Sequence, residues 1–185
     1  LFETASILLP VLEQGLPINI PVLRSAMTTV FGASDNEGAW VWKDAYEACE
    51  AALVLFLRKY LPQMRSSAAD PSQILSMLNA LSALLPTHTR RSDDSTLYQQ
   101  FSTPLELAFV AAMAADIQAA DHVLEPSAGT GMLAVHARAA GARLSLNELA
   151  VTRADMLCAL FGAEITSRFN AEQIDDYLPR ALTPS

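Results

Sequence analysis

The feature that most constrains the fold is an alternation of short apolar runs and helical segments over residues 121–170. Strands are predicted at DHVLEP, ARLSLNEL and AEITSRFN, and the two segments between them have helical periodicity and end at Gly141 and Gly162. A strand–helix–strand order with short links predicts parallel strands joined by right-handed crossovers. The second half of the chain is therefore predicted to form half of a doubly wound α/β sheet.

The first half of the chain has only helical patterns. Ser34 and Glu37 form a capping box before a run of apolar residues at helical spacing, which predicts a long helix that Pro62 ends. A second helix is predicted to begin at Asp70, where a proline occupies the first helical position. Prolines divide residues 1–31, so we expect short pieces there.

A polar segment separates the two halves. Residues 87–98 have no apolar period and carry neighbouring arginines and aspartates, as is typical of a solvated linker. The predicted organisation is an all-helical region over 1–86, a linker over 87–98 and an α/β domain over 99–185. A capped helix running to about Ala120 is predicted to open the α/β domain.

Charge and cysteine content exclude several classes of protein. The chain has 12 basic and 20 acidic residues, a net charge of -8, which is not the balance of a DNA-holding surface. Two cysteines exclude a disulfide scaffold and a four-cysteine zinc site, and the histidines lack partners at metal-ligand spacing, so we expect no metal. No secretory signal or long apolar run is present, and we expect a cytoplasmic protein without a membrane segment.

A glycine turn follows the first predicted strand. Its glycines let the backbone turn sharply and approach a ligand, and the free N–H groups of the next helix offer hydrogen bonds. In this strand–turn–helix context the turn predicts a nucleotide-type cofactor site, although glycine turns also end ordinary strands. The candidate residues of the turn are Glu125, Pro126, Ser127, Ala128, Gly129 and Gly131.

Three further residues are candidates for the same site. Glu148 ends the second predicted strand, where an acidic residue binds ribose hydroxyls; alternatively it is a carboxylate favoured at a helix start. Asn170 ends the third strand and could bind the adenine amine, or serve as a turn residue. Thr103 opens a helix and is suited to a carboxylate ligand, a role compatible with capping that helix.

The segments QFSTP, LEPSAGTG and NEL occur in this order between about residues 98 and 178. Together they resemble the amino-methyltransferases that use S-adenosylmethionine (AdoMet) to methylate adenine in DNA. The resemblance implies a Rossmann-like fold and assigns Thr103 to the methionine carboxylate and the turn from Glu125 to Gly131 to the methionine part. It assigns Glu148 to the ribose, and Asn170 falls where that family often has an Asp that reads the adenine amine.

The helical half is also similar to the N-terminus of bacterial methylase/helicase proteins of the Strawberry-notch-like family. That similarity rests on the segment from SAMTTVFGAS to FLRKY. It implies a parent polypeptide in which a methyltransferase-like region precedes a helicase.

The chain departs from the family at the catalytic motif. That motif, Asp/Asn-Pro-Pro followed by an aromatic residue after the fourth strand, does not occur in these 185 residues. We therefore expect AdoMet binding without methyl transfer, no catalytic residue, DNA contacts through C-terminal parts of the parent, and self-association at the open edge of an incomplete sheet. The alternatives are a non-catalytic interaction module with a methyltransferase-like fold, and a methyltransferase acting on RNA or on protein glutamine.

Overall fold

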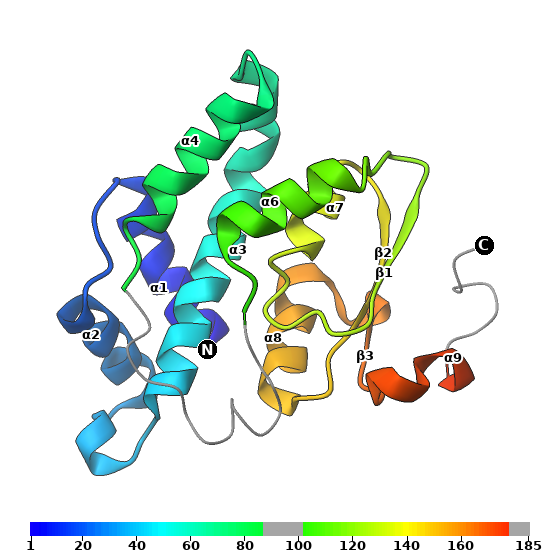
Figure 1. Ribbon diagram of the computed structural model, residues 1–185. Coiled ribbons are helices and arrows are strands. Elements are labelled where there is room, and N and C mark those ends of the chain that lie inside the picture. Colours follow the sequence, from blue (N-terminus) through cyan, green and yellow to red (C-terminus); the bar gives the residue numbers. More distant parts are fainter. Residues whose placement is uncertain (87–101, 178–185) are drawn as a thin grey trace. The chain divides into compact units, whose positions relative to one another are not determined.

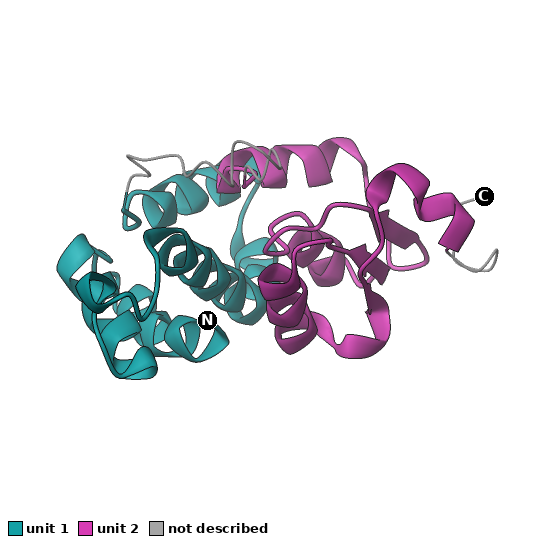
Figure 2. Ribbon diagram, turned by 90° about the horizontal axis from the view of Figure 1, so that it is seen from below, with its two compact units in different colours: residues 1–101 teal, residues 102–185 magenta. Residues whose placement is uncertain are grey.

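The structure is a computed structural model that describes residues 1–86 and 102–177 (Figure 1). The chain forms two compact units, Leu1–Phe101 and Ser102–Ser185, which we call the helical unit and the sheet unit (Figure 2). The division falls close to the polar segment noted in the sequence, but the predicted linker, residues 87–98, lies outside the described residues. The fold is mixed α/β with a helical N-terminal part.

The helical unit is built on one long helix. α3 contacts α1, α2 and α4, and the core between these helices is made of fully buried leucines such as Leu8, Leu57 and Leu61. The helices of the described part are α1 (Phe2–Glu13), α2 (Ile20–Phe31), α3 (Trp42–Ser67) and α4 (Pro71–Ser82), with a 3-10 turn, η1 (Asp35–Glu37), before α3.

The predicted start of α4 is confirmed. The carboxylate of Asp70 accepts the backbone N–H groups of Ser72 and Gln73, at 2.8 and 3.1 Å. The Gln73 side chain in turn accepts the N–H of Ala69. The predicted capping box also forms, since the Glu37 carboxylate accepts the N–H of Ser34, but it opens the short η1 turn rather than the long helix.

The predicted effect of two prolines was wrong. Pro62 does not end α3, which continues to Ser67, and Pro10 lies inside α1. A proline inside a helix removes one backbone hydrogen bond and crowds the preceding turn. Leu61, directly before Pro62, is fully buried. Pro10 lies between the buried residues Leu8 and Leu12. Core packing close to each proline therefore holds the helix together.

The sheet unit contains a parallel three-stranded sheet in the order β1-β2-β3, as the sequence predicts. His122 pairs with Arg143 and Glu125 with Leu146, so the carboxyl ends of β1 and β2 lie at the same edge. Figure 1 shows α7 and α8 on the same side of this sheet. The elements are α6 (Leu105–Ala114), β1 (His122–Glu125), α7 (Ala134–Ala139), β2 (Arg143–Asn147), α8 (Val151–Phe161), β3 (Thr166–Ser167) and α9 (Ile174–Tyr177), with 3-10 turns η2 (Ala163–Ile165) and η3 (Ala171–Gln173).

Two elements of the sheet unit are shorter than predicted. The third strand has only two residues, because the 3-10 turn η2 takes up the start of the predicted segment. The first helix of the unit ends at Ala114 rather than near Ala120, and Asp116 then adopts a positive φ of 47°, which a continuing helix does not allow.

Candidate functional site

The glycine turn follows β1 at the carboxyl edge of the sheet. The backbone N–H of Ala128 donates to the carbonyl of Asn147 in β2 (2.8 Å), and the N–H of Gly131 donates to the carbonyl of Ala128 (2.8 Å). Gly129 and Gly131 have φ values of +57° and +89°, the left-handed region that side chains disfavour. The turn is thus anchored to β2 by backbone hydrogen bonds.

Gly131 is also required by packing. A Cβ at this position would clash with the ring of Phe161, the last residue of α8, and would meet Leu157 at 3.1 Å. The glycine therefore lets the turn and the start of the next helix lie directly against α8. Ser127 and Pro126 are exposed, whereas Ala128 is buried.

Glu148 is brought to the turn by β2. Its carboxylate accepts the N–H of Gly129 (2.9 Å) through one oxygen and the N–H of Ala150 (2.9 Å) at the start of α8 through the other. Its own N–H donates to the carbonyl of Ser167 in β3 (3.1 Å). The residue is buried, so this single side chain connects the turn, the end of β2 and the start of α8.

Glu125 ends β1 beside the same turn. Burial raises the pKa of its carboxyl to about 8, and the nearby Glu148 carboxylate adds to that rise, while a hydrogen bond from the backbone N–H of Ala134 opposes it. Glu125 and Glu148, the two acidic residues predicted for the site, are therefore close enough to interact electrostatically. The Glu148 carboxylate occupies the N–H of Gly129 in the turn, and the Glu125 carboxyl occupies the N–H of Ala134 at the start of α7. An external anion would otherwise use these two N–H groups.

Asn147 is a residue of the site that the sequence analysis missed. Its buried amide donates to the carbonyls of Pro126 (3.0 Å) and Phe169 (2.9 Å). Its oxygen accepts the hydroxyl of Ser167 (2.9 Å) and the N–H of Phe169 (2.8 Å). One amide thus joins the segment after β1 to the segment after β3. The sequence signal was its place in NEL, directly before Glu148.

Asn170 lies one residue beyond this network. Its exposed side chain accepts the N–H of Glu172 (3.2 Å) and caps the 3-10 turn η3, which is the turn role considered as the alternative. Phe169, beside it, stacks on Tyr177 with ring centroids 4.8 Å apart and planes 8° apart. The adenine contact of Asn170 stays a prediction.

Thr103 lies half-buried, directly before α6. The N-cap position of α6 belongs to Pro104, which has no side chain that could cap the helix, so the capping role expected of Thr103 is not seen. α6 contacts α7, the helix that follows the glycine turn. Among the described residues, however, no hydrogen bond joins Thr103 to the network around Glu148 and Asn147.

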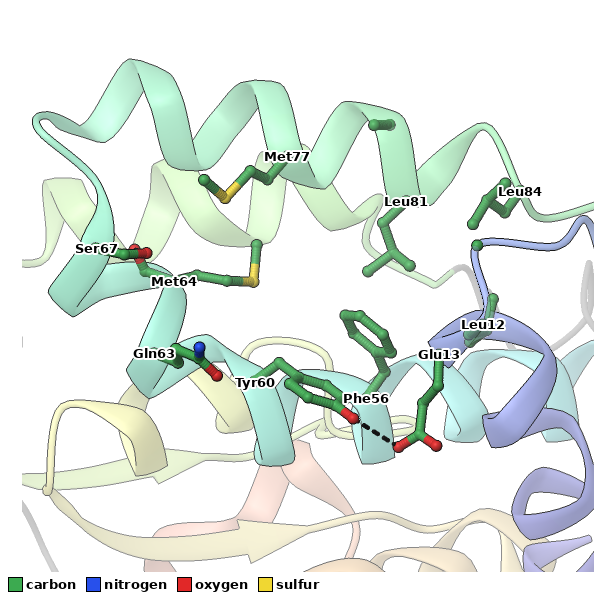
Figure 3. Close-up of a pocket in the computed structure, with 12 residues that line it drawn as sticks. Leu12, Glu13, Phe56, Tyr60, Gln63, Met64, Ser67, Met77, Leu81 and Leu84 are labelled. Carbon is green, nitrogen blue, oxygen red and sulfur yellow. Dashed lines mark hydrogen bonds between the residues drawn. The ribbon is translucent and has the colours of Figure 1, made fainter.

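A separate apolar cavity lies in the helical unit, between α1, α3 and α4 (Figure 3). Its volume is about 650 Å³, and Met64 and Met77 approach each other across it. At one side the hydroxyl of Tyr60 donates to the Glu13 carboxylate (3.0 Å), which also accepts the ammonium of Lys59 (2.6 Å). The sequence analysis singled out none of these residues.

The described residues hold no group of three or more His, Cys, Asp or Glu side chains that could bind a metal ion. In the same part of the chain, no helix combines the length and the apolar character needed to cross a membrane. Comparison of the chain with family models, with curated proteins and with solved structures finds no match in any of the three.

Proposed function

We propose that the sheet unit binds S-adenosylmethionine at the carboxyl edge of β1 and β2, as part of a Rossmann-like methyltransferase fold. The observation that carries the proposal is the bond from the N–H of Gly129 to the Glu148 carboxylate, which puts the acidic end of β2 against the glycine turn. In this fold a ligand binds where the strands end, and an acidic side chain at the second strand suits a ribose. The resemblance of LEPSAGTG and NEL to AdoMet-dependent enzymes supports the same ligand.

The charge of the site favours AdoMet over a dinucleotide. The Glu148 carboxylate accepts the N–H of Gly129, and the Glu125 carboxyl accepts the N–H of Ala134. N–H groups in these positions hold phosphates in other nucleotide sites. A pyrophosphate placed there would meet the like charge of the Glu148 carboxylate, whereas that carboxylate would attract the sulfonium and ammonium groups of AdoMet. The proposed binding residues are Thr103, Glu125, Pro126, Ser127, Ala128, Gly129, Gly131, Glu148 and Asn170.

The proposed parent is a cytoplasmic, adenine-directed DNA methyltransferase that also carries a helicase, and it would contact DNA through parts outside these residues. The chain itself has no Pro-Pro-aromatic motif to hold a target amine. We therefore expect the purified chain to incorporate no labelled methyl group into DNA. Methylated adenine formed by this chain alone would contradict the proposal.

Titration calorimetry with AdoMet tests the binding site. Glu148→Ala is expected to weaken binding by about 10- to 100-fold, because a hydrogen bond to a charged group contributes roughly 1.5–3 kcal/mol. Glu164→Ala, an exposed change in the same unit, should bind as the wild-type chain does. Equal heats from the wild-type chain and Glu148→Ala would remove Glu148 from the ribose role.

A non-catalytic interaction module is the second candidate. It is favoured by the fact that both oxygens of the Glu148 carboxylate already have backbone partners, Gly129 and Ala150, so the turn is held without a ligand. Under this alternative neither AdoMet nor its demethylated product binds in the calorimeter. A methyltransferase acting on RNA or on protein glutamine would bind AdoMet and differ only in its acceptor.

A further inference from the structure

We infer that Asn147 is a positioning residue, which holds the glycine turn and the segment after β3 in one arrangement. Through this link, a ligand bound at the turn also changes the position of the stacked rings of Phe169 and Tyr177. The inference rests on the proposed AdoMet site for its ligand, but its geometric basis does not. The NH₂ group of Asn147 is directed at backbone carbonyls of its neighbours, Pro126 and Phe169.

The geometry separates two halves of the amide. The NH₂ group reaches the carbonyl of Pro126 in the turn and the carbonyl of Phe169 after β3. The oxygen reaches only β3 and the segment after it, through the hydroxyl of Ser167 and the N–H of Phe169. The link between the two segments therefore depends on the NH₂ group, and the oxygen fixes the side chain to the segment after β3.

All four hydrogen-bonding positions of the amide are used, at distances between 2.8 and 3.0 Å. The residue is 1% exposed, so water cannot replace a lost partner without opening the site. Both backbone groups of Phe169 are held by this one side chain. The Phe169 ring, which stacks on Tyr177 in α9, is thereby placed by the same residue that holds the carbonyl before Ser127.

Two substitutions separate the two halves. Asn147→Asp keeps an accepting oxygen but replaces the NH₂ group with an oxygen that faces two carbonyls. Ser167→Ala removes one donor to the Asn147 oxygen and leaves the link to Pro126 intact. Asn79→Asp, an exposed change in the helical unit, makes the same chemical substitution without either contact.

The first measurement is amide hydrogen exchange of the ligand-free chain. Asn147→Asp is expected to speed exchange on the order of tenfold in both segments, residues 126–131 and 167–170, since unmatched buried hydrogen bonds favour local opening. Ser167→Ala should speed exchange only in the second segment, and Asn79→Asp in neither. Unchanged exchange in the turn of Asn147→Asp would overturn the inference whether or not AdoMet binds.

The second measurement follows the ring pair by fluorine NMR of chain labelled with 3-fluorotyrosine, in which Tyr177→Phe assigns the Tyr177 signal. Saturating AdoMet is expected to shift this signal in the wild-type chain and in Asn79→Asp, but not in Asn147→Asp. AdoMet that binds the wild-type chain without shifting the signal would overturn the coupling. If AdoMet binds neither the wild-type chain nor any variant, the proposed function is contradicted. The hydrogen-exchange measurement then tests the positioning role of Asn147 by itself.

Discussion

At the scale of single residues, three polar side chains define the edge of the sheet unit. Glu148 and Asn147 are buried, and their side chains bond backbone groups of neighbouring segments, with the hydroxyl of Ser167 as a further partner of Asn147. Glu125 differs, because burial and the neighbouring Glu148 carboxylate raise its pKa to about 8. The folded chain thus holds a proton on Glu125 that the unfolded chain loses at much lower pH.

Glu125→Gln is expected to flatten the dependence of stability on pH. The pKa of Glu125 is about 8 in the folded chain against an ordinary value of 4.5. Between these two pKa values the folded state binds more protons than the unfolded state. The contribution of Glu125 to the free energy of unfolding is therefore complete below the ordinary pKa of 4.5 and declines as pH rises to about 8. The glutamine variant cannot titrate and should lack this decline. Urea unfolding followed by circular dichroism at a series of pH values measures it.

The control for that series is Glu164→Gln, an exposed substitution that should retain the wild-type slope. Partners lower the pKa of Glu13, Asp35 and Asp70, so their contributions change at lower pH and with the opposite sign. A Glu125→Gln chain with the wild-type slope between about pH 5 and 8 would show that Glu125 does not hold the proton.

At the scale of elements, the glycine turn is shaped by the helix packed against it. Gly129 and Gly131 both need a positive φ, but only Gly131 lies directly against Phe161 and Leu157 of α8. A Cβ at Gly129 would meet the Arg153 side chain at 3.8 Å, an ordinary contact. Backbone conformation and packing can therefore be tested separately within one turn.

Gly131→Ala is expected to destabilise the chain more than Gly129→Ala. Both substitutions place an alanine in a left-handed conformation, which lowers the free energy of unfolding by about 1–2 kcal/mol. Gly131→Ala also overpacks the contact with α8, which lowers it by roughly a further 1–3 kcal/mol. Urea unfolding by circular dichroism gives the difference. Equal losses from the two variants would mean that α8 moves away from the turn at little cost.

At the scale of the whole molecule, the sheet leaves one edge of β1 available for pairing among the described residues, since β1 pairs there with β2 alone. The strand reads His-Val-Leu-Glu. Because an unpaired strand edge recruits another strand, we propose that the partner at this edge is a second copy of the chain.

The N–H of Arg143 donates to the carbonyl of Asp121, so in this parallel register the backbone N–H of Val123 faces β2 and that of Leu124 faces the open edge. Self-association is expected to depend on concentration and to be lost in Leu124→Pro, because proline cannot donate a backbone hydrogen bond at that edge. Small-angle scattering over a concentration series measures it, and Leu124→Ala, which keeps the N–H, should still associate. Circular dichroism checks that the proline variant remains folded. A wild-type chain that stays monomeric at every concentration would contradict the proposal.

The sequence by itself determined where several elements begin and how the strands are ordered. The cap at Asp70, the glycine turn and the parallel order of three strands follow from residues a few positions apart, because capping bonds, left-handed turns and apolar periods act locally. For the same reason the sequence pointed to Glu148 and to the turn as parts of one site.

Only the tertiary structure decided what depends on contacts between distant residues. Pro10 and Pro62 stay inside helices because buried leucines close to them pack these helices into the core, which a local rule about proline cannot include. The pairing of Asn147 with Pro126 and Phe169 spans 21 and 22 positions, and the demand for glycine at position 131 comes from a ring 30 positions away. These relations arise only once β2 and α8 lie beside the turn, because hydrogen bonds and steric exclusion act at contact distance.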